Sequence, residues 1–109
     1  MAYSESLAER IRHVVRQRPD IQEKKMFGGI GFLLSGNMLV GVWKDALIVR
    51  LEADYAADAL TKPHVREFDI TGKPMKGWIM VESEGIEDDE SLATWIARAM
   101  KFVETLPKK

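Results

Sequence analysis

Three short apolar runs follow one another with almost no chain between them, and this spacing constrains the fold more than any other feature. The runs cover residues 26–34, 38–43 and 46–51. The link 35–37 contains Gly and Asn, which tolerate a positive φ angle and therefore suit a hairpin loop. The link 44–45 is a second tight turn. Because such short links cannot form crossovers, the sequence predicts an antiparallel meander.

Elements on either side of the meander complete the predicted fold. Helical and alternating apolar patterns predict helices at 6–18, 53–61 and 89–105, and strands at 65–70 and 77–82. The first helix carries a capping-box pattern, Ser6 followed by Glu9. The predicted order is αβββαββα, a five-stranded antiparallel sheet with helices packed on it. We therefore expect one α+β domain over residues 1–109.

Apolar residues fall on both faces of the predicted sheet. In the strand 46–51, Leu47 and Val49 alternate with Ala46 and Ile48, so neither face is polar. A small antiparallel sheet that leaves one face in water should alternate more cleanly. We therefore expect the second face to be covered, most economically by a second copy of the chain in a homodimer.

Composition limits the partners and the compartment. Sixteen basic and seventeen acidic residues give a net charge of −1, so bulk charge does not indicate binding to nucleic acid, although a local patch remains possible. The first residues lack the basic and apolar segments of a signal peptide, and no apolar stretch approaches the length of a membrane span. We expect a cytoplasmic protein with no membrane partner.

The residues provide little for catalysis. The absence of Cys excludes disulfides, thiolate metal sites and cysteine nucleophiles. His13 and His64 match no metal-ligand spacing. The glycines at 28, 29 and 31 lead into a strand, whereas a phosphate loop opens a helix, so we favour a structural role for them. We expect no catalytic residue, no metal and no cofactor, and hence no enzyme.

Two loops that combine lysines with glycine and large apolar residues form the candidate binding surface. Its residues are Lys24, Lys25, Phe27, Arg50, Lys73, Met75, Lys76 and Trp78. If the loops meet, they form a basic patch with aromatic residues, suited to an acidic protein surface or to nucleic acid. A small anionic ligand held by Arg50 is a further alternative. The simplest interpretation is solvated turn lysines above core aromatics.

Several of these segments resemble the TfoX N-terminal-domain family, the domain shared with the competence regulators TfoX or Sxy. The matching segments are Lys25 to Phe32, Gly36 to Met38, Leu47 to Arg50, Asp69 to Gly77, and the last helix with Trp95. The similarity covers about residues 5–106. It implies a fold like that of the type III secretion chaperones, which share the order αβββαββα and commonly dimerise.

The resemblance also implies a kind of function. The competence regulators act with the cyclic-AMP receptor protein at certain promoters and carry a second, helical C-terminal domain. This chain is expected to be a stand-alone N-terminal domain, because it ends before such a domain would begin. We expect a regulatory or protein-interaction module, linked to transcription regulation, whose protein partner is unknown.

Overall fold

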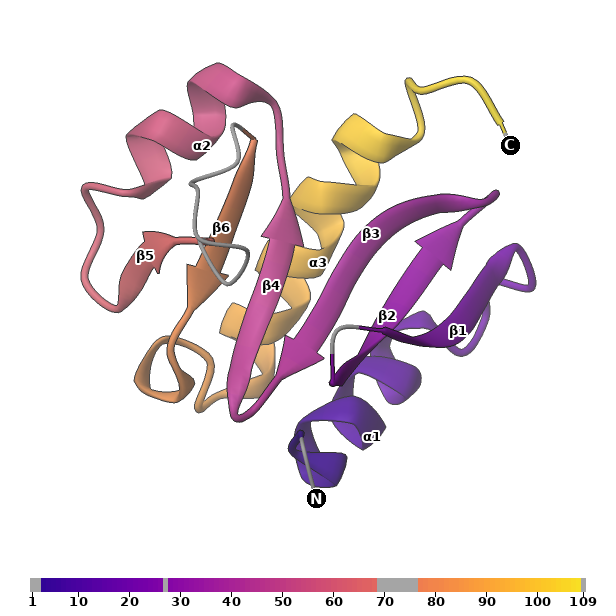
Figure 1. Cartoon of the computed structure of the whole chain (residues 1–109), viewed down its shortest axis with the longest axis horizontal. Coiled ribbons are helices and arrows are strands. Elements are labelled where there is room, and N and C mark those ends of the chain that lie inside the picture. Colours follow the sequence, from indigo (N-terminus) through magenta and orange to yellow (C-terminus); the bar gives the residue numbers. More distant parts are fainter. Residues whose placement is uncertain (1–2, 27, 69–76, 109) are drawn as a thin grey trace.

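The computed structural model describes residues 3–26, 28–68 and 77–108 (Figure 1). Within these residues the chain forms three α-helices, a short 3₁₀ helix and a six-stranded sheet in the order β1-β2-β3-β4-β6-β5. Every pair of neighbouring strands is antiparallel. The predicted α+β class and antiparallel sheet are therefore confirmed. The prediction of five strands is wrong, because the structure has six.

The elements follow the predicted meander and flanking helices closely. The strands are β1 (Ile21–Met26), β2 (Gly29–Leu34), β3 (Asn37–Trp43), β4 (Ala46–Arg50), β5 (Val65–Glu67) and β6 (Trp78–Val81). The helices are α1 (Glu5–Val15), α2 (Ala53–Ala59) and α3 (Asp89–Val103), with the 3₁₀ helix η1 (Ser83–Gly85) before α3. Each predicted helix is present, and each is shorter at its C-terminal end than expected.

The additional strand is β1, at one edge of the sheet. Its sequence, Ile21 to Met26, is mostly polar, so it lacks the apolar run from which strands are predicted. It pairs with β2 alone, and Met26 lies opposite Gly29. An edge strand needs only one neighbour and can therefore be polar. The predicted strand 26–34 in fact contains the last residue of β1, Met26, and the whole of β2.

The helix α1 begins earlier than the capping-box pattern predicted. The N-cap is Ser4, whose hydroxyl oxygen accepts a hydrogen bond of 3.1 Å from the backbone amide of Leu7. Ser6 lies inside the helix, and Glu9 pairs with the side chain of Arg12. The prediction of a Ser6–Glu9 capping box is therefore wrong. Ser4 and Ser6 are both residues that favour the N-cap position, and in the structure Ser4 occupies it.

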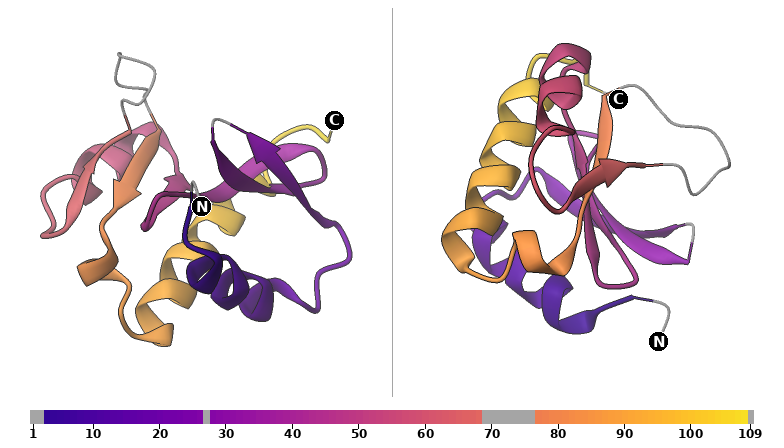
Figure 2. Two further views of the ribbon diagram at one scale, coloured as in Figure 1. Left: turned by 60° about the horizontal axis from the view of Figure 1, so that its bottom comes forward. Right: turned by 90° about the vertical axis from the view of Figure 1, so that its left-hand side faces the viewer.

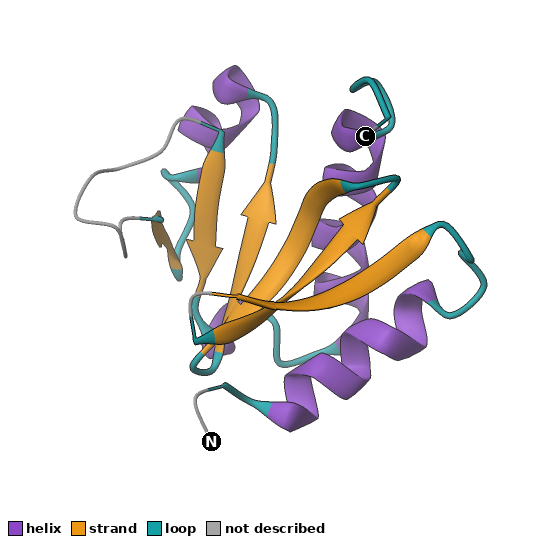
Figure 3. Ribbon diagram, turned by 45° about the vertical axis from the view of Figure 1, so that its right-hand side comes forward, coloured by secondary structure: helices purple, strands orange, loops and turns teal. Residues whose placement is uncertain are grey.

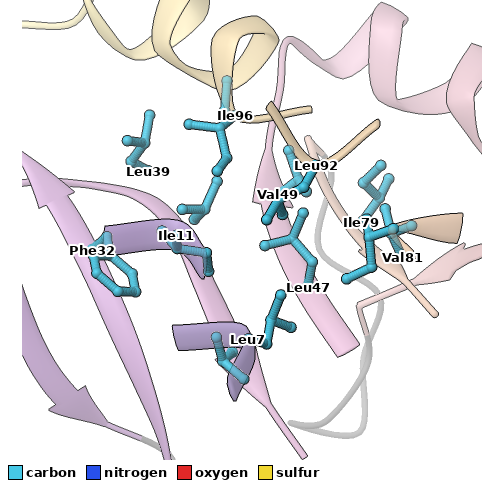
Figure 4. Close-up of a cluster of buried hydrophobic side chains, with 14 of the residues drawn as sticks. Leu7, Ile11, Phe32, Leu39, Leu47, Val49, Ile79, Val81, Leu92 and Ile96 are labelled. Atoms are coloured by element: carbon cyan, nitrogen blue, oxygen red, sulfur yellow. The ribbon is translucent and has the colours of Figure 1, made fainter. Parts of the chain in front are cut away.

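All three helices contribute to a core on one face of the sheet, which we call the helix face (Figures 2 and 3). The largest fully buried side chains include Ile11 of α1, Phe32 of β2, Leu47 of β4, and Leu92 and Ile96 of α3. Figure 4 shows these residues converging between the sheet and the helices. The apolar stripe of α3 is thus explained by burial against β3 and β4.

The opposite face of the sheet, which we call the second face, carries its own apolar cluster. Ala46, Ile48, Phe68 and Met80 are each buried to 4–6% exposure. Trp43 and Trp78 pack against them and are partly buried. The expectation that apolar residues occupy both faces is confirmed. Part of the cover comes from the chain itself, through Phe68 and the two tryptophans.

Candidate functional site

The glycine-rich motif that dominates the sequence forms the hairpin between β1 and β2. Gly28 has a φ angle of +76°, which L side chains rarely adopt. At Gly29, an added Cβ would lie 2.1 Å from the carbonyl oxygen of Val42, well inside contact distance. Gly29 is therefore required by the close approach of the Val42 backbone, and Gly28 adopts a backbone conformation that favours glycine. The structural interpretation of this motif is supported, although the glycines form a hairpin turn and not only the entry to a strand.

The two lysines of this motif point to opposite sides of the sheet. Lys24 and Lys25 are neighbours on β1 and are both exposed, so the pleat directs one side chain to each face. Lys24 lies in register with Gly31, on the second face, and Lys25 with Ile30, on the helix face. Two lysines on an edge strand also discourage pairing with another sheet. They do not form a single pair of charges.

Arg50 and Trp78 are the predicted site residues that the structure brings together. They are register partners across β4 and β6, and the guanidinium carbon of Arg50 lies 5.3 Å from the centroid of the Trp78 ring. The Trp78 ring also lies 5.8 Å from the ring of Phe68. This geometry is a cation–π contact on the second face, supported by an aromatic pair.

The other predicted residues do not join this contact among the described residues. One register row crosses the second face through Lys24, Gly31, Gly41, Ile48, Met80 and Arg66. Lys24 is therefore three strand spacings of about 4.8 Å from β4 and does not reach Arg50. The side chain of Phe27 and the residues Lys73, Met75 and Lys76 lie outside the described part of the chain. The predicted meeting of the two lysine loops stays a prediction.

Sequence reasoning missed a second cation–aromatic pair on the same face. The ammonium nitrogen of Lys44 lies 4.6 Å from the centroid of the Trp43 ring. A hollow of about 440 Å³ beside it is lined by Trp43, Lys44, Asp45, Ala46, Arg66, Met80, Glu82, Ser83 and Glu84. The position of Trp43 could be predicted from the sequence, because successive strand residues point to opposite faces and its neighbour Val42 belongs to the core.

The arginines of α1, by contrast, are occupied by ion pairs. Arg12 forms a hydrogen bond of 2.8 Å with Glu23 of β1 and also pairs with Glu9. Arg10 donates to the carbonyl oxygen of Ile86 at 2.7 Å and pairs with Asp89 at 3.1 Å. These contacts fix α1 against β1 and the start of α3.

A long groove between α2 and α3 is the other notable surface, on the helix side of the molecule. It encloses about 920 Å³ and is lined by Tyr55, Lys62, Asp88, Glu90, Ser91, Thr94, Trp95, Ala97, Arg98 and Lys101. The guanidinium carbon of Arg98 lies 3.9 Å from the centroid of the Tyr55 ring. The sequence did not predict this groove, because its walls come from segments that are distant in the chain, the nearest lining residues across it being Lys62 and Asp88.

In residues 3–26, 28–68 and 77–108, no group of three or more His, Asp or Glu side chains is arranged to hold a metal ion. His13 and His64 are both exposed. The same described segments contain no helix with the length and apolar character needed to cross a membrane.

Comparison with known proteins gives one result that covers most of the chain. The family model of the TfoX N-terminal domain matches residues 13–103. The matched region includes all six strands, α2, α3 and the last three residues of α1. No curated protein matches the chain.

Proposed function

This chain belongs to the TfoX N-terminal domain family, and from that premise we propose that it is a non-enzymatic regulatory module that acts through protein contacts. The family is associated with competence regulation, so a link to transcription regulation in the cytoplasm is part of the proposal. Its first partner is a second copy of the same chain. The contact surface is the second face of the sheet.

The observation that carries the proposal is the composition of the second face. Trp43 and Trp78 are partly exposed above the buried cluster of Ile48 and Met80, and each ring carries a cation. Aromatic residues, Met and Arg are enriched in protein interfaces, and Trp and Arg supply most of the strong contacts. A two-fold dimer would place the same patch of each copy against the other.

Sedimentation velocity over a wide range of protein concentration tests this proposal. We expect a species of twice the 12.4 kDa chain mass that dissociates in the variant Trp43→Glu. Lys101→Glu, on the helix side, is the matched control and should leave the mass unchanged. Far-ultraviolet circular dichroism confirms that each variant is folded. A wild-type chain that stays monomeric at the highest concentration rejects the homodimer.

Single-stranded nucleic acid is the second candidate partner. The stacking of Lys44 on Trp43 and of Arg50 on Trp78 places two cations beside aromatic rings on one sheet face. Single-strand binding surfaces combine aromatic side chains with positive charge, and their affinity falls steeply with salt. Fluorescence anisotropy with labelled DNA and RNA oligonucleotides measures this directly. If neither oligonucleotide binds at low salt, this candidate is rejected.

A further inference from the structure

The groove between α2 and α3 lies on the opposite side of the sheet from Trp43 and Trp78. Its lining residues come from α3 and the residue before it on one wall, and from Tyr55 of α2 and Lys62 on the other. The right-hand view of Figure 2 shows the ribbons of α2 and α3 on the same side of the sheet. A smaller hollow lined by Leu51, Glu52, Tyr55, Arg98, Lys101 and Phe102 continues it toward the C-terminal end of α3. The groove is thus separate from the surface on which the proposed dimer depends.

The packing of the two helices explains why the groove exists. The buried residues of α2 are Ala56 and Ala59, whose small side chains let this helix sit close to the sheet beside β6. The helix α3 packs instead over β3 and β4. Ser91, Trp95 and Arg98 of α3 are four and three residues apart and therefore lie on one side of the helix. This side faces α2. The two helices therefore leave a trough between their facing flanks.

The middle of the groove is aromatic. Trp95 of α3 packs partly against the core and is partly exposed along the groove. Tyr55 of α2 lies on the other wall, and Arg98 stacks on its ring. A ring held in this way loses little conformational freedom when another apolar side chain packs against it, which is typical of residues that contribute strongly to binding.

The charges of the groove are separated along its length. Arg98 and Lys101 lie in the C-terminal half of α3 and Lys62 lies on the opposite wall, whereas Asp88 and Glu90 lie at the N-terminus of α3. Among the ion pairs between described residues, none involves Lys62, Arg98 or Lys101, whereas Arg10 and Arg12 of α1 both pair with carboxylates. Asp88 is already used, because its carboxylate caps α3 by accepting from the amide of Ser91 at 3.0 Å.

The spacing of the cations indicates the kind of ligand. Arg98 and Lys101 are three residues apart on one helix, a rise of about 4.5 Å, and Lys62 stands on the opposite wall. A single phosphate is usually bound by donors that converge on one point. Cations distributed along an open groove instead match several carboxylates spaced along a peptide, such as those at positions i and i+3 or i+4 of a helix.

The geometry points to a docking site for an acidic amphipathic segment of a partner protein. An apolar side chain of the segment packs between Trp95 and Tyr55, and its carboxylates lie opposite Lys62, Arg98 and Lys101. The lining residues within α3 run from Glu90 to Lys101, a rise of about 16.5 Å, which matches about three turns of a bound helix. Grooves between helices are a common site for such segments.

Selection of displayed 16-residue peptides on the full chain tests the site. Peptides that also bind the variant Lys62→Glu/Lys101→Glu are first removed from the library. Both positions are exposed, so we expect this variant to keep the fold. We expect the enriched peptides to be acidic, with large apolar residues at helical spacing. Calorimetry should then show affinity that is weaker by about tenfold or more for the charge-reversed variant and falls with added salt.

Two controls keep this test specific. Trp43→Glu, on the second face, should leave the affinity of the selected peptides unchanged even if it abolishes the dimer. Lys101→Arg should bind the selected peptides like the wild type, because it preserves the positive charge. Three outcomes would each overturn the site. The selection enriches no peptide, or it enriches peptides without net negative charge, or the wild type and the charge-reversed variant bind with affinities within about twofold of each other.

Discussion

Arg50 lies over the indole ring of Trp78, its register partner on the neighbouring strand, at 5.3 Å from the ring centroid. This contact connects β4 to β6 on the second face, where Phe68 completes the aromatic group. Because β4 and β6 are separated in sequence by α2 and β5, the contact is a product of the tertiary fold. It holds a cation beside an apolar cluster, which is the combination expected at a protein interface.

Removing the cation from this contact should lower stability modestly. We expect Arg50→Gln to reduce the free energy of unfolding by about 0.5–1 kcal/mol, because cation–π contacts at exposed sites have this magnitude. Urea denaturation followed by circular dichroism measures the change. Arg50→Lys, which keeps a cation, should lose less. Equal losses in both variants would mean that the guanidinium contributes through packing and not through its charge.

The two glycines of the β1–β2 hairpin should respond differently to substitution. Gly29→Ala places a Cβ 2.1 Å from the carbonyl oxygen of Val42, so the backbone must shift and stability should fall by about 1–3 kcal/mol or more. In Gly28→Asn, the added Cβ meets no atom within 4 Å, and Asn tolerates a positive φ, so we expect a smaller loss. Thermal denaturation of both variants decides the matter, and an equal loss would refute the steric explanation.

Asn37 should tie the C-terminal segment to the sheet. It is 4% exposed at the start of β3, and its side-chain nitrogen donates to the carbonyl oxygen of Pro107 at 2.8 Å. Asn37→Ala leaves that carbonyl oxygen without its donor, and we expect a loss of about 1–2 kcal/mol. Hydrogen exchange should also show faster amide exchange near Leu106. The exposed control Thr105→Ser, which keeps the hydroxyl that donates to the carbonyl oxygen of Phe102, should show neither effect.

The N-cap of α3 should make stability depend on pH. The hydrogen bond from Ser91 holds the pKa of the Asp88 carboxyl below its ordinary value. Because the folded-state pKa is lowered, this contribution to stability is fully present above the unfolded pKa and is lost as pH falls through the folded pKa. The loss therefore occurs in the acid range, below the ordinary aspartate pKa.

The variant Asp88→Asn isolates this effect. It keeps an oxygen that can accept from Ser91 but no longer titrates. We expect its stability near neutral pH to stay close to that of the wild type, while the decline on acidification becomes shallower. Urea midpoints measured from neutral pH into the acid range provide the comparison. Identical acid profiles for the two proteins would exclude Asp88 as a contributor.

Much of the fold could be predicted because its signals are local. The apolar runs of β3 and β4, joined by a link too short for a crossover, specify an antiparallel pair from hydrogen-bonding geometry alone. The helical spacing of Leu92, Ile96 and Ala99 likewise identifies α3 and its buried side. The segments that match the TfoX N-terminal domain agree with this pattern.

The errors arose where a distant segment decides the local structure. The polar strand β1 forms because β2 offers it a partner, and nothing in its own composition indicates a strand. The start of α1 at Ser4 coincides with a backbone hydrogen bond from Ser4 to Lys44, in the turn between β3 and β4. In both cases pairing between segments overrides the weaker local preference.

The sequence by itself determined which residues are apolar, where the chain must turn and which helices are amphipathic, because these depend on neighbours along the chain. Only the tertiary structure decided that Lys24 and Lys25 face opposite sides, that Arg50 stacks on Trp78, and that Tyr55 and Trp95 line one groove. Such relationships depend on strand order and on where helices pack. They arise from burial and pairing between segments that are far apart in the chain.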